Sequence, residues 1–346
     1  MKTCLSKEYC TEVEEIYQER ISNLENRTFN GSIDSNKVQS VLCDCERFIC
    51  DYIDALQKKK IKNDEDDNLD YNEIEQLMNP KQAVLNPNEI NKFYDLSGKI
   101  KAYGRYRNLI PTYINELIQK SYDAGHNDFF FVFGDKSAYN FLGSCLDGTI
   151  NNPIEISFAG NCGSNFCLES NNVCTTILGD VGHYFGLNSS NLKAFVKGNV
   201  MCRFGGESKN LSVFLEGNCE SLFGRKSNNL TAIIQGDVEK YFGFESQYLA
   251  ANIKGNVEES FGNRCGHMVA EVDGDMNVCG SFSNAVYSTL SLLNEELLWK
   301  IDVRIRNGYS DRYPGFLNFL SPKKLNYLIL KDEEKEKLIA RFYIRW

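Results

Sequence analysis

The chain has 346 residues, of which 42% are hydrophobic and 25% are charged, a composition that is ordinary for a globular protein. Its formal net charge of −9 disfavours nucleic acid as a partner. No stretch is long and apolar enough to span a bilayer, and the N-terminal residues lack the apolar core of a secretory signal. We therefore expect a cytoplasmic protein whose thirteen scattered cysteines are free thiols, with neither membrane nor nucleic acid among its partners.

The first 104 residues carry a mostly helical pattern. Apolar residues recur at helical spacing over 4–26, and they do so again after Ser35, at Val38, Val41, Leu42, Cys45, Phe48, Ile49, Tyr52, Ile53 and Leu56. These two segments predict an antiparallel helical hairpin over residues 1–62. The charged stretch that follows, with two prolines further on, predicts a linker with an irregular or helical connection over residues 63–104.

A third helix and a strand lead into the middle of the chain. Pro111 suits the first turn of a helix and Gly125 suits its end, so a helix is predicted from about Pro111 to Ala124. The run of apolar residues from Phe129 to Phe133 then predicts a buried strand.

The middle of the chain repeats itself every nineteen residues. Glycine recurs at Gly160, Gly179, Gly198, Gly217, Gly236, Gly255 and Gly274. Phenylalanine follows six positions later at Phe166, Phe185, Phe204, Phe223, Phe242 and Phe261. In the segment before each recurring glycine, inward and outward residues alternate. Leu211, Val213 and Leu215 point inward, and Ser212, Phe214 and Glu216 point outward. This alternation indicates a strand with one buried face, and a fixed period of this length indicates stacked repeats.

These patterns predict a mainly β fold, a parallel β-helix (solenoid) of about seven to eight coils over residues 105–287, with the third helix as its lead-in. One coil cannot bury its inward face alone, but coils stacked about 4.8 Å apart can. Residues 288–346 are predicted to form a helical cap that ends in a helix over 322–340. Helical segments at both ends would cover the open edges of the stack.

The recurring residues are predicted to form ladders inside the stack. We expect the phenylalanines to stack in one column. Inward polar ladders are expected from Asn172, Asn191, Asn210 and Asn229 and from Ser170, Ser189, Ser208, Ser227 and Ser246. Each Gly-Asn or Gly-Asp pair is expected to form a corner, because these residues tolerate a positive φ angle.

The glycine repeat resembles the GXGXG domain, which closes the large subunit of glutamate synthase and also occurs as one of the subunits of formylmethanofuran dehydrogenase. The segments VKGNVMCRFGGESKNLSVFLEGN and IKGNVEESFGNRCGHMVAEVDGD carry the likeness best, and it covers roughly residues 105–287. The resemblance implies a right-handed parallel β-helix without catalytic residues, which holds catalytic domains in position. Many of the family's glycines are absent here and no amidotransferase or flavin domain accompanies the repeat, so glutamate synthase activity is not implied.

Few residues suggest chemistry, and we predict no catalytic, cofactor-binding or metal-binding residues and no cofactor. Cys43, Cys45 and Cys50 invite a metal interpretation, but Cys43 and Cys45 point about 200° apart on a helix, which favours packing. A catalytic pair of Cys265 with His267 lacks a third orienting group. Calcium is conceivable at the corner residues Asp180, Asp237 and Asp275, but asparagine occupies the same corner in other coils, which favours a role in the turn.

One group of large apolar residues is not required by the fold. Phe195, Phe214 and Ile233 occupy an outward strand position in three adjacent coils. Tyr184, Leu222 and Tyr241 lie outward just before the Phe-Gly pair. A column of this kind needs a cover, which is either the N-terminal helices or a partner, including a second copy of the chain.

The leading functional hypothesis is therefore a structural, scaffold or interaction protein in a larger cytoplasmic assembly. The first alternative is an accessory subunit of an amidotransferase or of a formylmethanofuran dehydrogenase-like complex, in which the solenoid positions a separate catalytic chain. The second alternative is a self-assembling β-helix filament, which helical segments at both ends would oppose.

Overall fold

The structure is a computed structural model that describes residues 7–28, 31–61, 71–78, 84–100, 108–132, 139–258, 260–265, 267–274, 287–292, 325–332 and 335–343. Its helices are α1 (Lys7–Glu25), α2 (Ser35–Ile61), α3 (Tyr71–Met78), α4 (Pro87–Ser97) and α5 (Leu109–Asp123). Its strands are β1 (Asp128–Val132), β2 (Ile154–Ala159), β3 (Val173–Ile177), β4 (Lys193–Val196), β5 (Lys209–Leu215), β6 (Asn228–Ile234), β7 (Tyr248–Ile253), β8 (His267–Val272), β9 (Tyr287–Leu292), β10 (Leu325–Asp332) and β11 (Lys335–Tyr343). Within the expected linker, residues 63–70, 79–83 and 101–104 lie outside the described residues, as does the segment 293–324.

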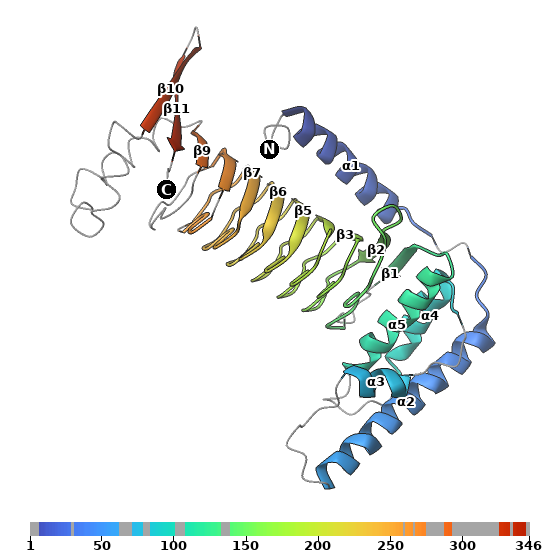
Figure 1. Ribbon diagram of the computed structural model, residues 1–346. Coiled ribbons are helices and arrows are strands. Elements are labelled where there is room, and N and C mark those ends of the chain that lie inside the picture. The colour runs from blue at the N-terminus through green and yellow to red at the C-terminus, as the bar shows by residue number, and fades with distance from the viewer. Residues whose placement is uncertain are drawn as a thin grey trace.

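The middle of the molecule is a parallel β-solenoid with a 19-residue period, and about five such turns lie in the described part of the chain (Figure 1). Neighbouring strands pair in chain order, and each residue faces its equivalent in the next turn, as Leu211 faces Leu230 and Leu230 faces Leu249. A second inward ladder of isolated bridges runs through Val181, Val200 and Cys219. The predicted strand pattern and its inward face are therefore confirmed.

The predicted phenylalanine column forms in the interior. The rings of Phe185, Phe204, Phe223, Phe242 and Phe261 stack with centroids 4.6, 4.9, 5.0 and 5.2 Å apart and with interplanar angles of 7–13°. The first four of these side chains are fully buried and Phe261 is 3% exposed. The column thus fills the interior of the solenoid along its axis.

The recurring glycines serve a different purpose from the one expected. Of the seven, Gly160 alone has a positive φ angle. A Cβ atom on Gly198 would lie 2.5 Å from the backbone oxygen of Gly179, and one on Gly217 would lie 2.4 Å from that of Gly198. These glycines are needed because successive turns approach one another too closely for a side chain. Positive φ occurs instead on both sides of the phenylalanine, as at Arg203 (φ 62°) and Gly205 (φ 61°) around Phe204.

The two predicted polar ladders form, and the serine ladder lies inside along its whole length, whereas the asparagine ladder is buried only at Asn172. The five serines are 0–1% exposed, and their hydroxyls donate to backbone oxygens, as Ser189 donates to Cys167 over 2.7 Å. The asparagines adopt positive φ angles of 51–66°, and Asn210 and Asn229 are exposed. Their amides bond from turn to turn, with Asn210 Nδ2 donating to Asn191 over 2.8 Å and Asn229 Nδ2 to Asn210 over 2.9 Å. The expected inward position therefore holds for Asn172, which is 7% exposed, but it is wrong for Asn210 and Asn229.

Helices α2, α4 and α5 close the β1 end of the solenoid, and their apolar side chains are continuous with its core (Figure 1). Phe93 of α4 stacks on Tyr113 of α5 at 5.9 Å, and Tyr94 meets Phe131 of β1 at 5.6 Å. The predicted helix over 111–124 is confirmed as α5, and Gly125 follows it with a φ angle of 100°. None of the described helices is long and apolar enough to cross a membrane.

A buried carboxylate joins the starts of α2 and α4. Glu89 is 3% exposed, forms a capping box with Asn86, and accepts hydrogen bonds from Lys37 Nζ at 3.0 Å and from the Asp34 amide at 3.2 Å. Burial acts to raise the pKa of Glu89, but the hydrogen bonds from Asn86, Lys37 and Asp34 outweigh it, so the pKa lies below its ordinary value.

Two predictions for the ends of the chain are wrong. The helices predicted over 1–62 both form, but they do not make the expected hairpin, because α2 packs on α4 and α5 whereas α1 packs on the solenoid. The C-terminal cap, where a helix was predicted over 322–340, contains the antiparallel strands β10 and β11. Strand β11 also pairs with β9, so this hairpin extends the sheet at the end opposite to β1.

Candidate functional site

Helix α1 lies across the strands on the outer face of the solenoid, as Figure 1 shows. Tyr17 of α1 is 1% exposed and its ring stacks on Phe214 with centroids 4.2 Å apart and an interplanar angle of 25°. Ile21 and Ile233 complete the buried part of this contact, and Phe195 packs against it at the side. The predicted outward column of Phe195, Phe214 and Ile233 therefore has a cover inside the chain.

Ion pairs and hydrogen bonds hold α1 against the solenoid along its length. Arg20 forms an ion pair with Glu155 at 2.8 Å and its guanidinium lies 4.9 Å from the ring centre of Phe195. Glu25 pairs with Lys197 at 2.7 Å. The Tyr17 hydroxyl donates to Glu216, and burial together with this bond raises the pKa of Tyr17. These contacts reach strands β2 and β4 and the residues just beyond β4 and β5, so α1 holds several turns together.

The six residues of the predicted interaction surface do not form one surface. Phe214 and Ile233 are 2% and 3% exposed beneath α1. Tyr184, Leu222 and Tyr241 come instead from the turn before each Phe-Gly pair, where their φ angles are 62–67°. Tyr241 is 39% exposed and meets Phe244 edge-on at 5.8 Å. This second group lies outside the α1 contact.

The Asp/Asn corners form a ladder of hydrogen bonds to the backbone. Asp180 Oδ1 accepts from the amide of Asn199 at 2.7 Å, and Asn199 Oδ1 accepts from the amide of Asn218 at 2.9 Å. The same bond joins Asn218 to Asp237 at 2.7 Å and Asp237 to Asn256 at 2.6 Å. Because aspartate and asparagine fill one role, the negative charge of aspartate is not needed there. Asp275 lies outside the described residues.

The cysteines singled out from the sequence are not brought together. Cys45 is buried in the core of the end cap, while Cys43 and Cys50 are exposed. Burial also raises the pKa of Cys45. Cys265 is fully buried, and the side chain of His267 lies outside the described part of the chain.

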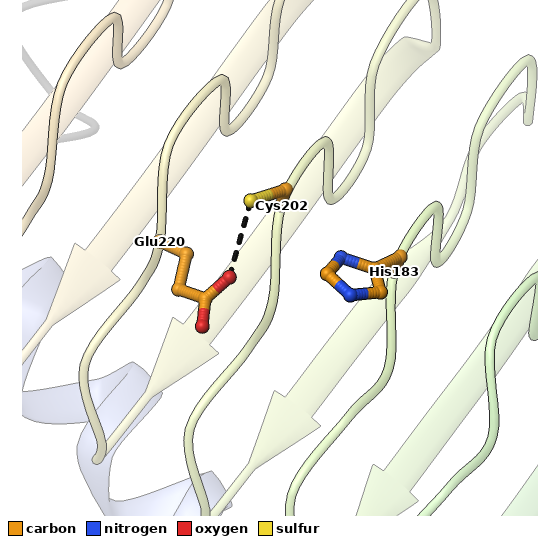
Figure 2. A group of neighbouring side chains, drawn as sticks. All are labelled: His183, Cys202 and Glu220. Carbon is orange, nitrogen blue, oxygen red and sulfur yellow. Dashed lines mark hydrogen bonds between the residues drawn. The ribbon is translucent and has the colours of Figure 1, made fainter.

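One group of side chains that sequence reasoning missed does come together. His183, Cys202 and Glu220 project from three successive turns, and their ligand atoms all lie within 4.8 Å of one another (Figure 2). Cys202 Sγ donates to Glu220 Oε2 over 3.1 Å. Burial, followed by this hydrogen bond, raises the pKa of Cys202. All three residues are half-buried, so solvent reaches the group.

The three residues of this group are visible in the repeat, but they occupy two different positions of the 19-residue unit. His183 and Cys202 are nineteen residues apart and occupy equivalent positions, whereas Glu220 lies one position earlier in its own turn. A search for identical residues at one phase does not find such a set. Within the described residues, it is the one group of His, Cys, Asp and Glu side chains close enough to hold a metal ion.

The fold thus defines the class of the protein as a parallel β-solenoid with a helical cap at its β1 end and a helix across one face. Comparison of the chain with family models, curated proteins and solved structures found no significant match.

Proposed function

We propose that this chain is a non-catalytic structural protein, which acts as a scaffold or subunit in a larger cytoplasmic assembly. The observation that supports this most is that the recurring polar residues form their hydrogen bonds within the stack. The serines, the asparagines and the Asp/Asn corners all bond within the stack, so the most regular part of the chain stabilises a rod. A rigid rod with a closed end and a fastened helix is suited to hold other chains at fixed positions.

The partner would contact the turns rather than the face covered by α1. Leu222 is half-exposed and Tyr241 is 39% exposed, and both project from adjacent turns of the same corner. Aromatic and large aliphatic side chains in such a position are typical anchors of protein interfaces. We therefore assign the partner contact to the corner formed by Tyr184, Leu222 and Tyr241.

The alternative function, an accessory subunit of an amidotransferase or formylmethanofuran dehydrogenase-like complex, rests on the resemblance to the GXGXG domain. The parallel pairing and the close approach of the glycines support that resemblance. Under this proposal the solenoid is right-handed and has seven to eight coils, which the continuation of the parallel pairing through β8 and β9 supports. A self-assembling filament has less support, because α4 packs on β1, the strand on which another copy would add.

Recovery of the tagged full chain from native lysate, with quantitative mass spectrometry, tests the proposal. We expect one or a few proteins in fixed ratio to the chain. Leu222→Ala combined with Tyr241→Ala should reduce their recovery, whereas Ile150→Ala, at a residue that is 80% exposed, should not. Co-recovery of an amidotransferase or a dehydrogenase subunit would favour the alternative. Recovery of the chain alone would contradict both.

A further inference from the structure

The group of His183, Cys202 and Glu220 offers three different kinds of metal ligand. It presents an imidazole nitrogen, a sulfur and a carboxylate oxygen from neighbouring turns. Figure 2 shows the thiol of Cys202 and the carboxylate of Glu220 facing each other, with the imidazole of His183 directed towards them. A mixed nitrogen, sulfur and oxygen set suits a borderline divalent ion such as zinc better than calcium or magnesium, which prefer oxygen alone.

The separations fit a tetrahedral ion after small side-chain rotations. Zinc bonds of about 2.3 Å to sulfur and about 2.0–2.2 Å to nitrogen and oxygen place the ligand atoms roughly 3.3–3.7 Å apart. The sulfur of Cys202 and the carboxylate of Glu220 are already 3.1 Å apart, and no pair in the group exceeds 4.8 Å. Rotation of the His183 side chain supplies most of the remaining approach.

The backbone holds the three positions in place before any ion binds. The amide of Tyr184 donates to the oxygen of Cys202 over 3.1 Å, and the amide of Arg203 donates to the oxygen of Ser221 over 3.0 Å. The amide of Glu220 donates to Val200 over 3.0 Å. Because the ligands project from one ladder, binding an ion requires no ordering of the chain.

The next turn shows that the stack does not require a thiol here. Ser221 is the equivalent of Cys202, and its hydroxyl donates to Glu239 over 3.1 Å, as the thiol of Cys202 does to Glu220. A serine therefore meets the structural need. Cysteine stands in place of this serine at position 202, and the residue nineteen positions earlier, in the preceding turn, is His183.

We propose that His183, Cys202 and Glu220 bind one divalent transition-metal ion of the zinc class, with a water molecule at the remaining position. The Cys202 thiol gives up its proton to solvent, and the thiolate sulfur bonds to the ion in place of the hydrogen bond to Glu220. Three protein ligands with one solvent position are the composition of an open zinc site. This proposal does not depend on the scaffold function.

Cobalt titration of the metal-free full chain tests the site. Cobalt(II) replaces zinc and gives a sulfur-to-cobalt charge-transfer absorption when a thiolate binds it. We expect one cobalt per chain with this absorption, and its displacement by one equivalent of zinc. Cys202→Ser retains the hydrogen bond seen at Ser221, so it should fold normally by circular dichroism and lose the absorption. His183→Ala and Glu220→Gln should weaken cobalt binding on the order of 100-fold.

The matched controls are Cys43→Ser and Cys50→Ser, which remove exposed thiols outside the group. Both variants should bind cobalt as the wild-type chain does. Absence of the charge-transfer absorption in the folded wild-type chain would overturn the proposal. So would its survival in Cys202→Ser, since the thiolate would then come from another cysteine.

Discussion

Replacing Phe223 with alanine removes one ring from the middle of the phenylalanine column. Phe223 is fully buried and lies between Phe204 at 4.9 Å and Phe242 at 5.0 Å, with interplanar angles of 7° and 13°. The substitution therefore removes two stacked contacts and leaves a cavity of about one ring.

The surrounding turns cannot close this cavity. Their spacing is fixed by backbone hydrogen bonds on both sides, from Gly224 to Phe204 at 2.7 Å and from Gly243 to Phe223 at 2.8 Å. Phenylalanine-to-alanine changes in protein cores cost about 3–5 kcal/mol, and the cost rises when the site does not collapse. We expect a loss of about 4–5 kcal/mol in the free energy of unfolding.

Urea unfolding followed by far-UV circular dichroism measures this loss. The matched control is Leu222→Ala, because Leu222 is the adjacent residue and is half-exposed in the turn. We expect that variant to remain within about 1 kcal/mol of the wild type. Equal unfolding free energies for the two variants would refute the stacked column as the core of the molecule.

Four further substitutions test other parts of the structure. Gly217→Ala should lower the free energy of unfolding by about 1–3 kcal/mol, since its Cβ meets backbone rather than a side chain; an unchanged urea midpoint would contradict the close approach of the turns. Tyr17→Ala should loosen α1 and increase the fluorescence of a hydrophobic dye, whereas Ile16→Ala, at a residue that is 40% exposed, should not; equal dye binding by both would count against the α1 cover. Asp237→Asn should change the free energy of unfolding by at most about 0.5 kcal/mol, because asparagine can accept the same backbone hydrogen bond. Added calcium should leave the melting temperature of the wild type unchanged. Stabilisation by calcium would instead indicate an ion site at the corner. Folding lowers the pKa of Glu89, so the contribution of this carboxylate to the free energy of unfolding is present above pH 4.5 and is lost as pH falls below that value. The difference in stability between the wild type and Glu89→Gln should therefore shrink at low pH. A difference that stays constant across pH would refute this linkage.

The period of the repeat was sufficient to predict the solenoid, because it reports which residues become neighbours. A residue that recurs every nineteen positions meets its own kind in the next turn, so the phenylalanine column follows directly from the sequence. Alternation along a strand likewise separates Val213, which faces inward, from Phe214, which faces α1.

Alternation does not continue through a corner, so it could not place the asparagine ladder. Asn210 and Asn172 have nearly the same φ angle, 53° and 51°, yet Asn210 is exposed while Asn172 is buried and donates to the oxygen of Gly148, so burial at this corner depends on what lies over each turn. The purpose of Gly217 was also misread, because close approach between turns depends on their spacing in space and leaves no local pattern.

The ends of the chain depend on contacts that local patterns do not specify. The apolar stripe of α1 identifies a buried helix face but does not decide between a hairpin with α2 and the outward column, both of which the sequence offered. The contact of Tyr17 with Phe214 shows that α1 covers the column, and the hairpin does not form. Residues 322–340 are rich in leucine, lysine and glutamate, which favour helix, yet Leu325–Asp332 and Lys335–Tyr343 pair as strands. Pairing of β11 with β9 is a long-range contact that propensity does not include.

The mass of the chain under native conditions tests the claim of a scaffold or subunit most directly. The chain alone has a mass of 39.4 kDa. Size-exclusion chromatography with light scattering, applied to the native complex, should give a larger mass that includes partner proteins in fixed ratio, and the mass should fall when Leu222 and Tyr241 are replaced with alanine. A single species of 39.4 kDa in native extract would contradict the proposed function.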